Sequence, residues 1–124
     1  MLLRWVDGRP VSAVTTQCLA WLTARLAAAG KTALLMVGDH ASWHGSAAVR
    51  PWLQAHNRRV KRHGGGRVVV CPVPRKRPWL NRLEPTWGHG KRASAAPART
   101  LHVEELQHRS CIYYDCERLA SMVQ

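Results

Sequence analysis

Acidic residues are scarce in this sequence of 124 residues: Asp and Glu number 7 against 19 Lys and Arg, which leaves a formal net charge of +12. A positive field of this size in a small chain favours a polyanionic partner, and nucleic acid is the commonest one. An anionic membrane surface is the alternative, but no basic amphipathic helix with a clean apolar face stands out. The composition therefore predicts a nucleic-acid-binding protein, with neither a membrane nor a small-molecule substrate as partner.

Long apolar runs and export signals are also missing, and the cysteines show no close pairing except a C-x4-C near the end of the chain. The longest apolar run, residues 33–37, is too short to span a bilayer, and no signal peptide opens the chain. We therefore expect a soluble, cytoplasmic protein with reduced thiols. No C-x-x-C pair supports a closed zinc site. His40 and His44, one helical turn apart, leave metal binding open as a weaker alternative. The four cysteines are Cys18, Cys71, Cys111 and Cys116.

The hydrophobic pattern alternates between strand and helix along the chain. Strands are predicted at residues 2–6, 32–37 and 67–71, and helices at 12–29, 46–61, 81–96 and 101–122. Pro51 leaves open a later start of the second helix near Arg50, with Pro51 at its first position. Within residues 32–37, positions 33–37 are continuously apolar, which predicts a central strand covered on both faces. Gly30 is expected to cap the preceding helix. This order predicts an α/β fold with a largely parallel sheet flanked by helices, in one domain over residues 1–96 with a helical tail over 97–124.

Two of the seven carboxylates stand out by position. Asp39 follows the predicted central strand, where open α/β sheets place their ligands, and Glu84 begins a helix after the next strand. Arg82 lies two residues before Glu84, which suits a site where acids hold divalent metals and cations hold phosphates. A turn role for Asp39 is the structural alternative. For Glu84 the alternative is a capping box with Asn81.

Two segments carry a resemblance to a known family: VGDHASWH at residues 37–44 and PWLNRLEPTW at residues 78–87. Together they resemble the catalytic domain of bacterial insertion-sequence transposases in the mariner-like superfamily of DDE endonucleases. The family pattern reads D-N-A-x-x-H and then P-x-L-N-P-I-E-x-x-W. The resemblance extends over residues 8–12 and 55–61, so it covers nearly the whole chain.

This resemblance implies a partial RNase H-like fold with a mixed sheet, and an activity that cuts DNA and transfers strands at insertion-sequence ends. It implies Mg²⁺ or Mn²⁺ as cofactor, DNA as partner, a nucleoid-associated location in a bacterium, and it leaves a homodimer open. Asp39 and Glu84 match the second and third catalytic, metal-binding acids. His44 and Asn81 match supporting positions beside them. In such sites, paired metals clamp the entering and leaving oxygens.

The first acid of the family pattern has no counterpart here. Asp7 is the single acid upstream of Asp39, and it matches the far end of the third strand in the family's fold. We therefore expect the first two strands and the DNA-reading helix-turn-helix region to be absent, and the chain alone to bind DNA without cutting it. His40, Arg77 and Arg82 also replace the family's Asn, Ser and Pro. A non-enzymatic basic DNA-binding protein is the alternative.

The cations expected to contact DNA act through counterion release at phosphates. They are Arg58, Arg59, Lys61, Arg62, Arg67, Arg75, Lys76, Arg77, Lys91 and Arg92. A merely solvated surface is the alternative for each of them. Trp43, Trp52, Trp79 and Trp87 are expected in the core rather than stacked on bases. We also expect the carboxyl groups of Asp39 and Glu84 to lie within about 10 Å of each other at the carboxyl edge of the sheet, close enough to share metals.

Overall fold

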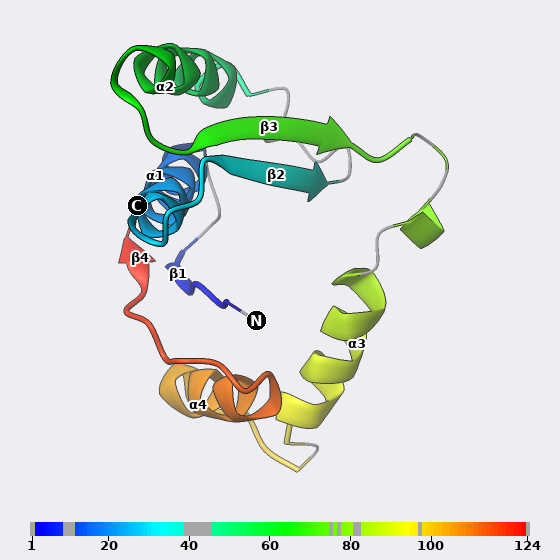
Figure 1. Cartoon of the computed structure of the whole chain (residues 1–124). Coiled ribbons are helices and arrows are strands. Elements are labelled where there is room, and N and C mark those ends of the chain that lie inside the picture. Colours follow the sequence, from blue (N-terminus) through cyan, green and yellow to red (C-terminus); the bar gives the residue numbers. More distant parts are fainter. Residues whose placement is uncertain are drawn as a thin grey trace. The chain divides into compact units, whose positions relative to one another are not determined.

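The structure is a computed structural model that describes residues 2–8, 12–38, 46–74, 76, 78–80, 83–96 and 98–123. Over these residues the chain is α/β, with helices α1 to α4 and two parallel sheets of two strands each (Figure 1). It divides into two compact units. The sheet unit comprises Val6–Leu80 and Met122–Gln124, and the hairpin unit comprises Met1–Trp5 and Asn81–Ser121. The predicted α/β class is confirmed, whereas the RNase H-like fold and the division after residue 96 stay predictions.

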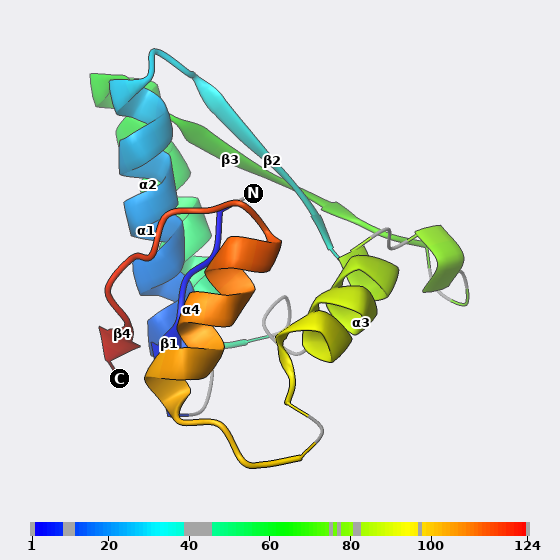
Figure 2. The ribbon, with the colours of Figure 1, turned by 90° about the horizontal axis from the view of Figure 1, so that it is seen from below.

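The sheet unit is built on the parallel pair of β2 (Ala33–Gly38) and β3 (Arg67–Pro72), in which Leu35 is paired with Val69. The predicted pairing of these two segments is confirmed. Helices α1 (Ser12–Ala28) and α2 (Val49–His63) contact each other and lie side by side next to the strands (Figure 2). The chain thus runs from β2 through α2 to β3, a strand–helix–strand crossover of the kind that parallel strands require.

Strand β2 is covered on one face, so the prediction of a strand buried on both faces was wrong. Burial alternates along it, and the side chains of Leu35 and Val37 are 64% and 65% exposed. On β3, by contrast, Val68 is only 3% exposed. A continuous apolar run is typical of a strand between two helical layers. Among the described residues of this unit, α1 and α2 supply a single layer.

The end of α1 agrees with the prediction for Gly30. This glycine has a φ of 74°, and its N–H donates to the carbonyl of Ala27 at 3.0 Å. The N–H of Lys31 donates to the carbonyl of Leu26 at 2.8 Å. This pair of bonds is a Schellman motif, which satisfies carbonyls that the last helical turn would leave without donors.

Helix α2 starts at Val49, between the two predicted starts and one residue from the alternative near Arg50. The hydroxyl of Ser46 accepts the N–H groups of Ala48 at 3.2 Å and Val49 at 3.4 Å, and it bonds the Ser12 hydroxyl at 2.6 Å. Ser46 therefore joins the beginnings of α1 and α2. Pro51 falls in the first turn of α2, where a helix has no partner for the missing N–H.

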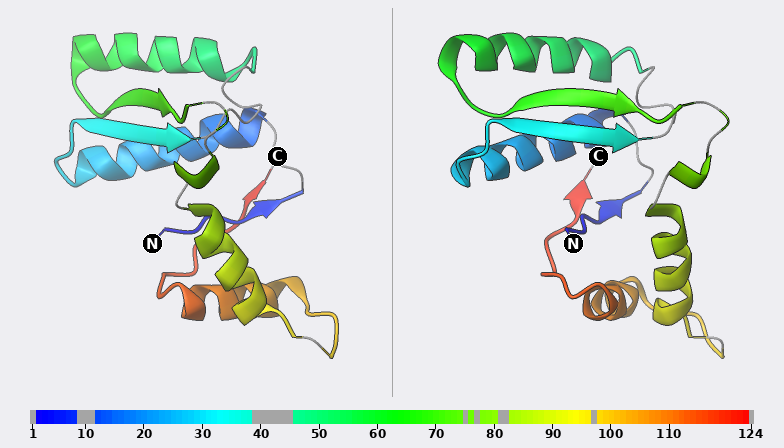
Figure 3. Two further views of the ribbon diagram at one scale, coloured as in Figure 1. Left: turned by 90° about the vertical axis from the view of Figure 1, so that its right-hand side faces the viewer. Right: turned by 45° about the vertical axis from the view of Figure 1, so that its right-hand side comes forward.

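The last predicted helix is much shorter than expected. Helix α4 spans Val103–Tyr113, and the chain then becomes extended and ends in β4 (Met122–Val123). Strand β4 pairs in parallel with β1 (Val6–Asp7), as can be followed in Figure 3. Asp115, with a φ of 47°, ends the helix. A left-handed residue that is neither Gly nor Asn gives little warning in a sequence.

The hairpin unit packs α3 (Leu83–Ser94) against α4. Tyr114 closes this contact, because its hydroxyl donates to the carbonyl of Thr86 at 2.9 Å and its ring meets the edge of Trp87 at 5.8 Å between centroids. Behind it, the hydroxyls of Ser110 and Ser94 bond at 3.1 Å in a buried position. The tyrosine ring also lies directly on Gly90: a β-carbon there would stand 1.8 Å from the Tyr114 oxygen.

Replacing Gly90 by Ala is expected to destabilise the hairpin unit by about 3 kcal/mol, because the tyrosine ring must leave its site. Thermal unfolding of the purified variant measures this loss. Gly88→Ala is the matched control on the same helix, since a β-carbon there meets only the Arg92 side chain at 3.8 Å. That variant should gain up to about 1 kcal/mol from helix propensity. Equal stability of the two variants would contradict the packing described for Tyr114.

Candidate nucleic-acid interface

Side chains of α2 fix this helix to the outer edge of β3. The side-chain amide of Asn57 makes the two hydrogen bonds that a neighbouring strand would make with Val68. Its Nδ2 donates to the Val68 carbonyl at 2.8 Å, and its Oδ1 accepts the Val68 N–H at 2.9 Å. One turn earlier, Trp52 stacks on His56 with ring centroids 5.0 Å apart. These residues form the inner face of α2, so the opposite face is directed to solvent.

His56 holds one defined tautomer. It is buried, its Nε2 lies 2.8 Å from the Gly66 carbonyl, and its Nδ1 lies 3.2 Å from Nη2 of Arg59. Because a guanidinium can only donate, Nδ1 accepts from Arg59 and Nε2 carries the proton given to Gly66. Arg59 is therefore partly engaged in holding the helix, although the sequence placed it among the DNA-contacting cations.

Arg58 and Arg62 lie on the outer face of α2, and Lys61, one turn after Asn57, lies at its side; all three are exposed. Arg67, at the start of β3, is exposed as well. The side chains of these four residues make no hydrogen bond or ion pair with any other described residue. Between described residues, the single ion pair is that of Arg99 and Glu105 in the hairpin unit. We call Arg58, Lys61, Arg62 and Arg67 the α2 cationic surface.

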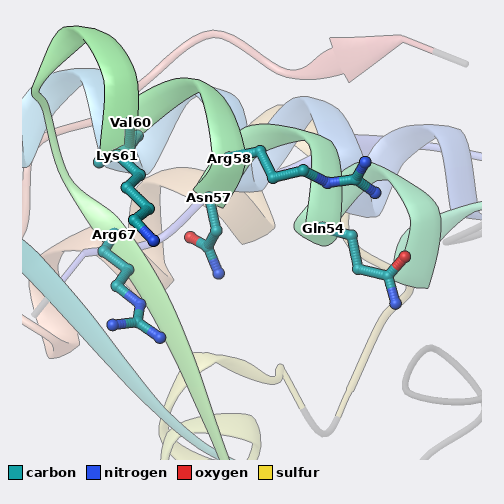
Figure 4. A pocket seen from close by; sticks show the side chains of 6 residues that line it. All are labelled: Gln54, Asn57, Arg58, Val60, Lys61 and Arg67. Atoms are coloured by element: carbon teal, nitrogen blue, oxygen red, sulfur yellow. The ribbon is translucent and has the colours of Figure 1, made fainter.

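Two hollows open on the α2 cationic surface. The larger, about 810 Å³, is lined by Gln54, Asn57, Arg58, Val60, Lys61 and Arg67 (Figure 4). The smaller, about 330 Å³, is lined by Ala55, Arg58, Arg59, Arg62 and His63. Arg58 borders both. Cations and amides that converge on open hollows can hold several anionic oxygens at once, which is the chemistry of a phosphate-backbone contact.

The remaining predicted cations lie elsewhere. Lys91 and Arg92 are exposed in the last turn of α3, in the hairpin unit, and Arg92 contacts Nδ1 of His89 at 3.1 Å. Lys76 is exposed with a φ of 61°. Arg75 and Arg77 lie outside the described residues.

Of the residues predicted to carry catalysis, the structure describes one. Glu84 is exposed in the first turn of α3. Asp39, His44 and Asn81 lie outside the described residues, so the expected approach of Asp39 to Glu84 stays a prediction. Within the ranges that the structure describes, no three His, Cys, Asp or Glu side chains gather as a metal-binding group. In those same ranges, no helix has both the length and the hydropathy of a membrane span.

Sequence reasoning missed two features of this site. Asn57 was not assigned the role of an edge partner, although a polar residue on the inner face of an amphipathic helix is a signal for such a bond. The expectation of buried tryptophans was wrong for Trp79 and Trp87, which are 68% and 46% exposed. Trp87 lies one turn before Lys91, so α3 presents an aromatic ring and a cation on the same face.

Comparison of the chain with protein-family models, curated protein sequences and solved structures finds no match. The resemblance to DDE transposases therefore stays an expectation from the motifs at residues 37–44 and 78–87.

Asn57→Ala should destabilise the chain by about 2 kcal/mol, because it leaves the N–H and carbonyl of Val68 without their partner. Asn57→Asp retains the acceptor but sets a carboxylate oxygen against the Val68 carbonyl, so it should lose at least as much. Urea-induced unfolding measures both. Gln54→Ala, an exposed position on the same helix, is the control and should stay within about 0.5 kcal/mol of the parent. An Asn57→Ala variant as stable as the control would show that the edge contact contributes nothing.

Proposed function

We propose that this chain binds DNA through the α2 cationic surface, and that it is part of the catalytic domain of a DDE transposase that does not cut DNA by itself. The observation that carries the proposal is the set of outward-facing cations on α2 with no described acidic partner. Fixed positive charges of this kind are attracted to a duplex that carries one negative charge per about 1.7 Å of its axis.

The geometry favours phosphate contacts over base recognition. Arg58 is three residues before Lys61 and four before Arg62, so its stem neighbours both of theirs on the helix surface. Arginine offers two parallel donors to a phosphate, and lysine offers a compact charge. Contacts of this type position a protein on nucleic acid and carry no sequence information. The proposed binding is therefore tolerant of DNA sequence.

The transposase assignment draws on the motif resemblance, in which Asp39 and Glu84 stand for the second and third acids. Their carboxylates are the oxygen ligands that Mg²⁺ and Mn²⁺ prefer. Such a metal, when bound, stabilises the charge that develops on phosphodiester oxygens. The only acid upstream of Asp39 is Asp7, in β1. Two carboxylates provide too few ligands for two metal ions, which is why we propose that the chain binds DNA without cleaving it.

Salt dependence of binding to duplex DNA tests the first part of the proposal. Replacing Arg58 and Lys61 by Gln should lower the slope of log affinity against log salt by about 2, because each phosphate contact contributes about 0.9. The control is the double variant Arg99→Gln and Arg118→Gln, which removes the same charge from side chains bonded to Glu105 and Gln107. Its slope should stay close to that of the parent. If both variants give the same slope, the salt dependence reports net charge alone and an α2 site is refuted.

Nicking of supercoiled DNA in Mg²⁺ or Mn²⁺ tests the second part. The parent chain should leave the plasmid intact, and Glu84→Gln should bind DNA as well as the parent or slightly more tightly, since it removes a negative charge. Metal-dependent nicking by the parent that disappears in Asp39→Ala and persists in Asp7→Asn would overturn the claim that the chain does not cut. If the parent chain neither binds nor nicks DNA, both hypotheses are refuted: the transposase and the non-enzymatic basic DNA-binding protein.

A further inference from the structure

Helix α4 ends in the same Schellman arrangement as α1, with a different residue in the left-handed position. The N–H of Cys116 donates to the carbonyl of Cys111 at 3.0 Å, and the N–H of Asp115 donates to that of Ile112 at 3.3 Å. Asp115 itself has a φ of 47°. These two bonds return the chain sharply across the last turn of the helix.

In a Schellman motif, one of the two hydrogen bonds joins residues that are five positions apart. The side chains of those two residues frequently contact each other on the helix surface. Here both of those residues are cysteines. The hydrogen bond between their backbones keeps the Cα atoms roughly 5–6.5 Å apart, within the range that a disulfide bridges. Cys111 is buried, at 7% exposure, and Cys116 is partly exposed. One sulfur is thus accessible from solvent, and the other is held beside it.

We propose that Cys111 and Cys116 are a redox-modification site, at which an intramolecular disulfide forms by exchange with a low-molecular-weight disulfide such as oxidised glutathione. The thiolate of Cys116 attacks one sulfur of the oxidant, forms a mixed disulfide and releases one thiol. The thiolate of Cys111 then attacks the Cys116 sulfur and releases the second thiol. The protein loses two protons and two electrons, and one disulfide of the oxidant becomes two thiols.

Before oxidation, the surroundings of Cys111 and Cys116 favour the protonated thiol of Cys116. Burial raises the pKa of the Cys116 thiol, and its hydrogen bond with the Cys111 thiol raises this pKa further. The exchange is consequently slow near neutral pH and accelerates as the thiolate forms. The site is independent of the proposed DNA-binding function, because α4 and residues 114–121 belong to the hairpin unit.

The bridge would fix the segment that follows α4. Arg118 donates from Nη2 to Oε1 of Gln107 at 3.2 Å, and Nε2 of Gln107 donates to the Ser121 hydroxyl at 3.3 Å. This segment returns along α4 and holds to it by those side-chain bonds. A disulfide at its beginning would keep residues 116–121 against the helix even when these bonds open.

The experiment uses the full chain with Cys18 and Cys71 replaced by Ser, equilibrated in mixtures of oxidised and reduced glutathione at about pH 8. After acid quenching and alkylation, trypsin cleaves at Arg109 and Arg118 and releases residues 110–118 as one peptide with both thiols. The bridged peptide is two hydrogens lighter and carries no alkyl group. We expect half-formation at an oxidant-to-reductant ratio about tenfold lower in the native chain than in urea. Equal ratios in both solvents would overturn the proposal.

A shifted pair separates the motif from simple proximity along the chain. In the variant Cys116→Ser with Glu117→Cys, the second thiol stands one residue beyond the hydrogen-bonded position. Its bridge should need a ratio about tenfold more oxidising than the parent. As a companion, Asp115→Gly keeps the left-handed conformation and should leave the parent ratio unchanged. A shifted pair that closes as readily as the parent, or exclusive glutathionylation of Cys116, would refute the site.

Discussion

The bidentate contact between Asn57 and the backbone of Val68 determines how the sheet unit presents its charge. A strand at the edge of a sheet has N–H and carbonyl groups without a partner strand, and Asn57 satisfies one such pair from a helix. His56 adds a second attachment at Gly66, just before β3 begins. Two consecutive residues of α2 therefore set both the distance and the rotation of the helix about its axis. With its rotation fixed, the positions of Arg58, Lys61 and Arg62 follow.

Cations held in this way repel one another, because no described carboxylate lies among them. In water this repulsion is weak, and an anion in the hollows beside Arg58 would offset part of it. Under the proposed function, an anion would bind beside the residues that attach the helix to β3, because Asn57 lines the larger hollow and Arg59, which bonds His56, lines the smaller one. The surface is preorganised in this sense: the fold holds the charges together, and the ligand supplies the neutralisation.

The sequence predicted those features that depend on local pattern. The helix over residues 12–29, its Gly30 cap and the parallel pairing of 32–37 with 67–71 follow from periodicity and from one glycine, and they agree with α1, β2 and β3. The long final helix was wrong because Asp115 ends α4 without a Gly or Pro. The burial of Trp79 and Trp87 was wrong because hydrophobic character alone does not indicate how many layers cover a residue. The cations of α2 were predicted individually, but their assembly around two hollows needed the structure. The meeting of Asp39 with Glu84 stays a prediction.

The uncovered face of β2 has a consequence for the behaviour of the protein in concentrated solution. Leu35 and Val37 form an exposed apolar strip. In the described sheets each strand pairs along one edge, so the other edge of β2 has backbone groups without a partner strand. An apolar strip beside such an edge favours association between molecules. The net charge of +12 opposes contact between two such strips, because like-charged molecules keep apart at low ionic strength. Added salt shortens the reach of this repulsion to within about 10 Å at 0.1 M. Colloidal stability and the proposed attraction to DNA would therefore both depend on this charge, and screening would weaken both together.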